Sequence, residues 1–187
     1  MSTWGNVASS GRHLSLDRTL ALTAFRALDA RLPEPVRLIL GGGTAMILAH
    51  GHPIATTDAD AFPVRGTLSE LAPYATAVAK ELDLEPDWLN PWFITFTHVL
   101  PSDYGTRLVR VFEGGKLTVD ALGAEDLLVM KCFAGRDKDR PHLLRLLKQA
   151  KDLDLVDRHL SVLVEKRIPN AQKAADLFDD MRERIGR

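Results

Sequence analysis

The sequence predicts an α+β fold, in which a small mixed β-sheet is flanked by helices and followed by a helical C-terminal part. Three observations lead to this prediction. Two short apolar segments, Val36 to Leu40 and Thr57 to Phe62, have the pattern of strands bounded by proline or glycine. The segment "RLVRVFEGGKLTVDAL" (residues 107–122) alternates apolar and polar residues on both sides of a glycine turn, which is typical of a β-hairpin. The remaining third of the chain has helical spacing only, so strands and helices do not alternate as in a doubly wound α/β fold.

Helices are expected where apolar residues recur at intervals of three and four. The first is capped by Ser15 and ends near Leu32, before the helix-breaking "LPEP". The others are expected at residues 44–50, 68–82, 124–135, 141–153, 156–166 and 171–185. We therefore expect a flexible leader over residues 1–14, an α/β core over residues 15–122, and a helical part over residues 123–187 that packs on the core.

The composition is that of an ordinary soluble globular protein, with 45% hydrophobic and 26% charged residues among 187. The single cysteine, Cys132, excludes an internal disulfide and fits a reducing cytosol. No apolar run approaches the ~20 residues that a membrane helix needs, and residues 1–15 lack the apolar core of a signal peptide. We expect a cytoplasmic protein that has no membrane partner.

The net charge of −1 is unevenly distributed. Residues 131–187 hold 14 Lys and Arg against 10 Asp and Glu, whereas residues 1–130 hold 10 against 15. A basic C-terminal third could face a polyanion. Ordinary solvated helix faces explain the same counts, and charge alone favours that explanation.

The stretch "RLILGGGTAMILAHGHPIATTDADAF" (residues 37–62) places a glycine corner before two carboxylates. Gly42 and Gly43 permit a sharp turn and a close approach to a ligand, and Thr44 would open a helix whose free N–H groups favour phosphate. Asp58 and Asp60 are two apart on the expected strand, so they point to one face, where their charges repel unless a cation such as Mg²⁺ lies between them. The stretch lacks the Walker and dinucleotide glycine patterns. A "DxD" by itself is more often an exposed loop, but with the glycine corner it suggests a metal–nucleotide site.

This stretch resembles the opening motif of the polymerase-β-like nucleotidyltransferase superfamily. Two further segments, "PDWLN" (residues 86–90) and "EDLLVMKCFAGRDKDRPHLLRLL" (residues 125–147), are similar to the AbiEii-type and MenT-like nucleotidyltransferases, many of which are toxins of toxin–antitoxin pairs. The resemblance covers residues 36–147. It implies a nucleotidyltransferase core over residues 15–122 and an active site that the C-terminal helices complete.

The resemblance also implies a role for each matching residue. Asp58 and Asp60 would hold Mg²⁺, with Asp120 on the second hairpin strand as a weaker third ligand, for which turn capping is the more common alternative. Lys131, which would otherwise be assigned to the surface, would reach the triphosphate, and Asp139 would be a base or an orienter for the attacking hydroxyl. The residues expected to bind the nucleotide are Gly42, Gly43, Thr44, Thr56, Arg136 and Lys138.

The chain departs from the family pattern at two positions. Ile54 stands where relatives usually have an arginine, and His142 stands where they often have a second aspartate. His50 and His52 have no third ligand at zinc spacing, so a helix end is expected there and not a metal site. Four aromatic residues are expected first in the protein core: Trp88, Trp92, Phe93 and Phe96. The alternative is that they stack on a base at the rim of a pocket.

The function expected from this resemblance is a Mg²⁺-dependent transfer of a nucleoside monophosphate from an NTP to an acceptor hydroxyl. The resemblance points to the tRNA 3′ end as the acceptor, to a role as a growth-inhibiting toxin, and to a cognate antitoxin protein as a partner. Two alternatives stay open. One is a nucleotidyltransferase that modifies a small molecule or a protein. The other is a catalytically weakened module that binds a nucleotide or a partner, which the missing arginine at Ile54 would favour.

Overall fold

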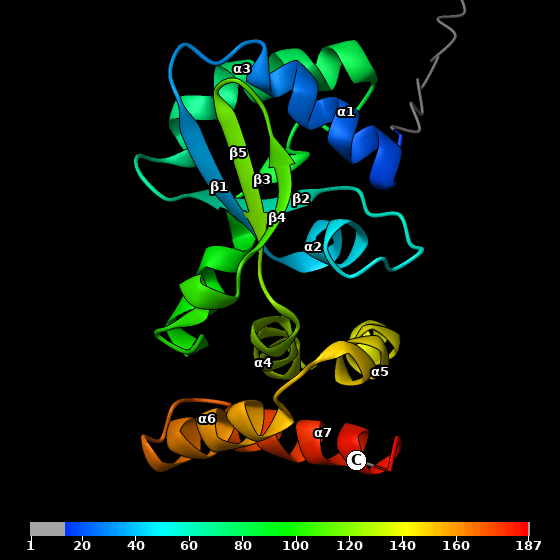
Figure 1. Cartoon of the computed structure of the whole chain (residues 1–187), viewed down its shortest axis with the longest axis vertical. Helices are drawn as coiled ribbons and strands as arrows, with labels where there is room; N and C mark the ends of the chain where they lie inside the picture. The colour runs from blue at the N-terminus through cyan, green and yellow to red at the C-terminus, as the bar shows by residue number, and fades with distance from the viewer. Residues whose placement is uncertain (1–13, 187) are drawn as a thin grey trace, which may run out of the picture.

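The computed structural model describes residues 14–186 and contains a mixed sheet with helices around it and a helical block at one end (Figure 1). The sheet has five strands in the order β3-β2-β1-β5-β4. Strand β1 pairs in parallel with β5 and antiparallel with β2, so the predicted mixed α+β fold is confirmed. The strands are β1 (Val36–Leu40), β2 (Ala59–Pro63), β3 (Leu89–Asn90), β4 (Val109–Glu113) and β5 (Leu117–Ala121).

Three helices accompany the sheet: α1 (Arg18–Asp29), α2 (Gly42–Leu48) and α3 (Leu68–Leu82). The prediction that Ser15 caps the first helix is wrong. The side chain of Asp17 accepts a hydrogen bond from the Leu20 N–H and caps α1. Ser15 precedes this cap in an extended segment, where Leu16 forms a β-bridge with Thr56. All of the predicted leader except Leu14 lies outside the described residues.

The segment between α3 and the hairpin contains elements that the sequence pattern did not predict. After the short strand β3, two 3₁₀ helices follow, η1 (Trp92–Val99) and η2 (Tyr104–Arg107). Strand β3 runs parallel to β2 at the edge of the sheet. This pairing places η1 beside the start of β2, where the two predicted aspartates lie.

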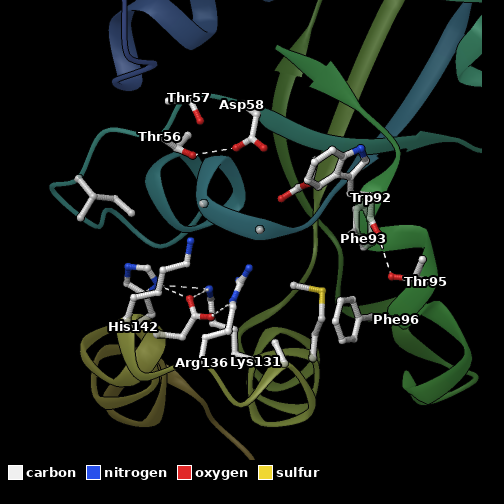
Figure 2. A pocket seen from close by; sticks show the side chains of 18 of the residues that line it. Thr56, Thr57, Asp58, Trp92, Phe93, Thr95, Phe96, Lys131, Arg136 and His142 are labelled. Carbon is white, nitrogen blue, oxygen red and sulfur yellow. Dashed lines mark hydrogen bonds and ion pairs between the residues drawn. The ribbon is translucent and has the colours of Figure 1, made fainter. Parts of the chain in front are cut away.

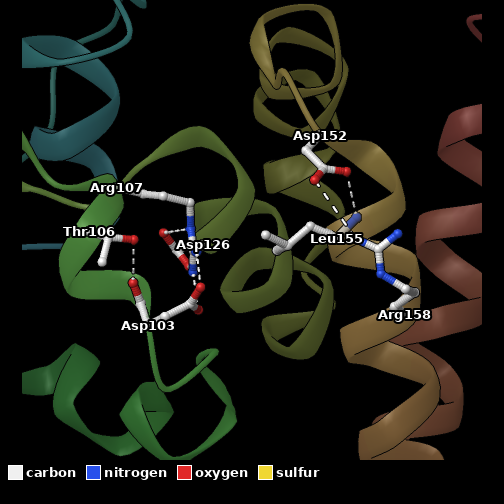
Figure 3. Close-up of polar contacts among 7 residues, drawn as sticks. All are labelled: Asp103, Thr106, Arg107, Asp126, Asp152, Leu155 and Arg158. Atoms are coloured by element: carbon white, nitrogen blue, oxygen red, sulfur yellow. Dashed lines mark hydrogen bonds and ion pairs between the residues drawn. The ribbon is translucent and has the colours of Figure 1, made fainter.

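The C-terminal part consists of α4 (Ala124–Ala134), the 3₁₀ helix η3 (Asp137–Asp139), α5 (Arg140–Gln149), α6 (Leu153–Glu165) and α7 (Ala171–Glu183). Each predicted helix is present. Helix α5 ends earlier than expected and α6 begins earlier, because the Asp152 carboxylate accepts the Leu155 N–H at 2.8 Å and caps α6 (Figure 3). No helix within residues 14–186 is long and apolar enough to cross a membrane.

Helix α4 occupies the centre of the molecule. It packs against α5, α6, α7 and η1, and nearly all of its side chains are buried, including those of Glu125, Asp126 and Lys131. In Figure 1, α4 and α5 lie between the sheet and the outer pair α6 and α7. A lysine in this helix is therefore buried unless it opens into a cavity.

An ion pair joins the core to α4. The Arg107 guanidinium at the end of η2 donates to both carboxylate oxygens of Asp126, with Nη2–Oδ1 at 2.8 Å and Nε–Oδ2 at 3.1 Å (Figure 3). Asp126 is fully buried in the first turn of α4, and Arg107 also binds the exposed Asp103. Such a two-point contact has a defined geometry, so it holds the first turn of α4 at one position relative to the sheet.

Candidate active site

The glycine corner is built around Gly42, which the structure requires to be glycine. Its φ of +59° lies in the left-handed region, and a Cβ at this position would overlap Oδ2 of Asp60. Helix α2 begins at Gly42 and not at Thr44, so the predicted start of this helix is corrected by two residues. The chain therefore bends directly against the second aspartate of the "DxD" pair.

The two aspartates open into one cavity, as the alternation of the strand predicts. Asp58 directly precedes β2 and Asp60 lies within it, while Ala59 and Ala61 are fully buried on the opposite face. The Asp58 carboxylate is held on both oxygens: Oδ1 accepts from Thr56 Oγ1 at 3.0 Å, and Oδ2 accepts from the Asn90 amide at 3.2 Å.

The carboxylate of Asp60, in contrast to that of Asp58, has no hydrogen-bond partner among the described residues. Burial, and next the charge of Asp58, raise the pKa of Asp60 to about 6. An oriented carboxylate beside an unpartnered one is a place where a cation relieves the repulsion.

The opposite wall of the cavity is basic and comes from the C-terminal helices. Lys131 and Asp139 are each 2% exposed and form an ion pair, with Nζ–Oδ1 at 2.8 Å. Arg136 donates from Nε to Oδ2 of Asp139 at 2.6 Å, and His142 contacts Oδ1 at 3.0 Å. Lys138 lines the same wall.

These contacts determine the protonation of the buried pair. Burial by itself would raise the pKa of Asp139, but the hydrogen bond from His142 and the charge of Lys131 hold it well below its usual range. Burial lowers the pKa of Lys131, and the charge of Asp139 opposes this shift. Asp139 is therefore a carboxylate that orients its neighbours and does not accept a proton near neutral pH. Of its two predicted roles, the geometry favours orienter over base.

A third wall is apolar. It is formed by η1 together with Met130 and Ala134 of α4. Trp92 is 68% exposed and faces the cavity, and its backbone N–H donates to the side chain of Asn90 at 3.0 Å. Asn90 thus ties Asp58 to the aromatic wall. The other three aromatic residues differ in environment. Trp88 is in the core, whereas Phe93 and Phe96 line the cavity, and Phe93 is buried there.

The three walls enclose a cavity of about 750 Å³, within the range of small-molecule sites. Figure 2 shows Asp58 across the cavity from Lys131, Arg136 and His142, with Trp92 to one side. Of the eleven residues predicted for the site, nine line this cavity: Gly42, Gly43, Thr56, Asp58, Asp60, Lys131, Arg136, Lys138 and Asp139.

Two predicted site residues lie elsewhere. Thr44 is fully buried beneath the cavity, and its hydroxyl donates to the backbone carbonyl of Asp58 at 2.7 Å. Asp120 is held between two arginines on neighbouring strands, Arg37 at 2.7 Å and Arg110 at 2.6 Å, and does not line the cavity. Its expected weak role as a third metal ligand therefore has no support in this geometry. Among the described residues, no group of three or more His, Cys, Asp or Glu side chains forms a metal site.

The two histidines after α2 have structural contacts. His50 Nε2 lies 3.0 Å from the carbonyl oxygen of Leu122, and the His52 ring packs edge-on against the His142 ring, with centroids 4.8 Å apart. Sequence reasoning assigned no role to Asn90, and it treated His142 only as a departure from a pattern. The signal for Asn90 was its place at the end of "PDWLN".

Comparison with known proteins gives one family. The model of a family described as "nucleotidyltransferase of unknown function (DUF6036)" matches residues 21–184. No curated protein and no solved structure matches the chain. The matched region contains every residue that lines the cavity.

Proposed function

We propose, from the premise that this chain belongs to the DUF6036 family of nucleotidyltransferases, that it transfers a nucleoside monophosphate from an NTP to an acceptor hydroxyl and releases pyrophosphate. The observation that carries this proposal is the charge pattern of the cavity. Two carboxylates face a cluster of cationic side chains, and an aromatic wall adjoins both. A nucleoside triphosphate has the matching parts: a metal-binding anionic chain and a flat apolar base.

The donor set fits Mg²⁺. Asp58 and Asp60 offer hard oxygen ligands, and the raised pKa of Asp60 with no donor on its carboxylate indicates a place for a cation. Asp58 and Asp60 would hold the ion. When bound, Mg²⁺ would supply charge neutralisation at the phosphates, which lowers the barrier to attack on phosphorus.

The residues of the chain would then position the reactants. The backbone at Gly42 and Gly43 lines the cavity without side chains, so phosphate oxygens can approach it closely. The exposed guanidinium of Arg136, together with Lys138 beside it, would balance the charge that develops on the leaving pyrophosphate. Trp92 offers an exposed ring for the base. Catalysis would come mostly from positioning and electrostatics.

The identity of the acceptor is proposed from the family resemblance. The resemblance to AbiEii-type and MenT-like enzymes supports the tRNA 3′ end as acceptor, and with it the role of a toxin held inactive by an antitoxin. The excess of Lys and Arg in residues 131–187 agrees with an RNA acceptor. Ile54 lines the cavity where relatives usually have an arginine, and positive charge is supplied from the opposite wall by Lys131, Arg136 and Lys138.

The test is incubation of the protein and Mg²⁺ with each α-labelled NTP and total RNA. We expect label in RNA of tRNA size, and loss of labelling in Asp60→Asn. Asp157→Asn, which changes an exposed acid on α6, is the matched control. Label that stays out of RNA but enters the small-molecule or protein fraction would redirect the acceptor assignment. Absence of both transfer and Mg²⁺-dependent NTP binding would refute the proposal.

A further inference from the structure

His142 and Asp139 form a dyad at the edge of the cavity. His142 lies in the first turn of α5, and its Nδ1 is 3.0 Å from Oδ1 of Asp139 and 3.2 Å from Nζ of Lys131. An ionised carboxylate oxygen only accepts hydrogen bonds, so the imidazole nitrogen facing it carries the proton. In this tautomer Lys131 and His142 donate to the same oxygen of Asp139. In the other tautomer Lys131 would donate to Nδ1, and the 3.0 Å contact between Nδ1 and the carboxylate oxygen would have no proton, so we assign the proton to Nδ1.

This arrangement leaves the other ring nitrogen of His142 as an acceptor. Within residues 14–186, Nε2 has no hydrogen-bond partner, and the one buried side-chain nitrogen or oxygen without a partner there is Nδ1 of His52. Nε2 of His142 is consequently accessible. Because His142 lines the cavity and is 17% exposed, its free nitrogen is available to a bound molecule.

The ring is also held in place by its neighbours. His52, from the loop after α2, packs edge-on at an interplanar angle of 86°. Burial, and next the charges of His142, Arg145 and Lys131, lower the pKa of His52, so this neighbour is a neutral ring that packs without adding charge. Lys131 from α4 and Asp139 from η3 fix the Nδ1 side. The imidazole thus has one orientation and one tautomer, as an oriented base requires.

The other acidic groups lining the cavity are committed elsewhere. Asp139 accepts three donors and has a pKa well below its usual range. Asp58 and Asp60 are assigned to the metal. Asp120, where the resemblance would put a third carboxylate, is bound by two arginines outside the cavity. Among the described residues that line the cavity, His142 is the side chain whose ring nitrogen Nε2 remains free to accept a proton from a bound molecule.

We propose that His142 is the general base of the transfer reaction, with Asp139 as the residue that positions it; this inference rests on the proposed function. The acceptor O–H gives its proton to Nε2 of His142, and the oxygen attacks the α-phosphorus. The bond from the α-phosphorus to the bridging oxygen breaks, and its electron pair leaves with pyrophosphate. The imidazolium then returns its proton to solvent, so atoms and charge balance.

The discriminating variant is His142→Asn. The asparagine amide can replace Nδ1 as a donor to Asp139, but it has no nitrogen that accepts a proton. General base catalysis contributes about 10²- to 10⁴-fold, so we expect transfer from labelled NTP to fall by at least ~100-fold with NTP affinity unchanged. If His142 only positioned Asp139 and Lys131, the asparagine would do the same, and the rate of transfer would change little. Should His142→Asn be poorly folded, His142→Gln is judged by the same criterion.

A pH profile gives the second readout. Because Nε2 must be free to take the acceptor's proton, the wild-type turnover at saturating Mg²⁺ should fall on the acid side, and this limb should disappear in His142→Asn. It should persist in His98→Ala, which removes an exposed histidine that does not line the cavity. Added imidazole should restore part of the activity of His142→Ala.

The outcomes separate the two proposals. Wild-type protein that binds Mg²⁺–NTP and transfers label, alongside a His142→Asn variant that keeps turnover within about 3-fold or keeps the acid limb, overturns the inference and leaves the proposed function standing. Wild-type protein with neither binding nor transfer overturns both.

Discussion

Replacing Asp60 by asparagine should make the protein more stable and inactive. The pKa of Asp60 rises from an ordinary 3.8 to about 6, first because of burial and then because of the charge of Asp58. One pKa unit corresponds to about 1.4 kcal/mol, so this rise corresponds to about 3 kcal/mol for ionising the group in the folded state before solvent screening is considered. Because Asp60 is partly exposed, solvent screening reduces this, and we expect ~1–2 kcal/mol.

The pH dependence has a definite sign. Well below pH 3.8 the carboxyl is protonated in both the folded and the unfolded state, so wild type and Asp60→Asn should have similar stability. As pH rises from about 4 to above 6, the unfolded chain loses its proton first, and the wild type loses stability relative to the variant. The difference in the free energy of unfolding should be complete by about pH 7.

The measurement is urea unfolding of both proteins between pH 4 and pH 8, with and without Mg²⁺. Bound Mg²⁺ should stabilise the wild type, by about 2.7 kcal/mol at a hundredfold excess over its Kd, and should leave the variant unchanged. An Asp60→Asn variant that is less stable at pH 7.5, or a difference that does not change with pH, would refute this reasoning.

Three further changes have outcomes fixed by the same structure. Gly42→Ala should cost at least ~1 kcal/mol in thermal unfolding and abolish Mg²⁺–NTP binding, because φ is +59° and the new Cβ meets a carboxylate; Gly105→Ala, which has open space, is the control. Trp92→Ala should weaken NTP binding about tenfold in calorimetry, since a stacked base contributes about 1–3 kcal/mol, whereas Ile94→Ala on the same exposed 3₁₀ helix should not. Arg107→Met should lower the free energy of unfolding in urea by about 3 kcal/mol, because it leaves a buried carboxylate in α4 unpaired; a loss below ~1 kcal/mol would contradict that assignment.

The sequence pattern was sufficient for features that depend on local spacing. The two-residue period of a strand placed Asp58 and Asp60 on one side, and the structure opens both into one cavity. Lys131 is an exception, because the local pattern by itself assigned it to the surface and only the family resemblance pointed to a role in the site. The helices of the last third were also found, with ends displaced by a few residues.

What the sequence could not reveal depends on contacts between distant segments. Strand β3 has two residues and is defined by its pairing with β2, so it is too short for a periodic pattern to predict it. Asn90 reaches Asp58 across 32 positions of chain. The neutralisation of Asp120 by Arg37 and Arg110 follows from the register of three strands, which local patterns leave open.

The cavity walls come from chain segments that meet only in the folded molecule, and the Arg107–Asp126 pair is one of several polar contacts between them. Nucleotide binding therefore requires that the sheet and the C-terminal helices stay packed together. If the C-terminal helices separate from the sheet while keeping their own helicity, circular dichroism changes little, yet affinity for nucleotide vanishes. Binding of a fluorescent nucleoside triphosphate would then detect the separation of the helices from the sheet at a stage where circular dichroism does not.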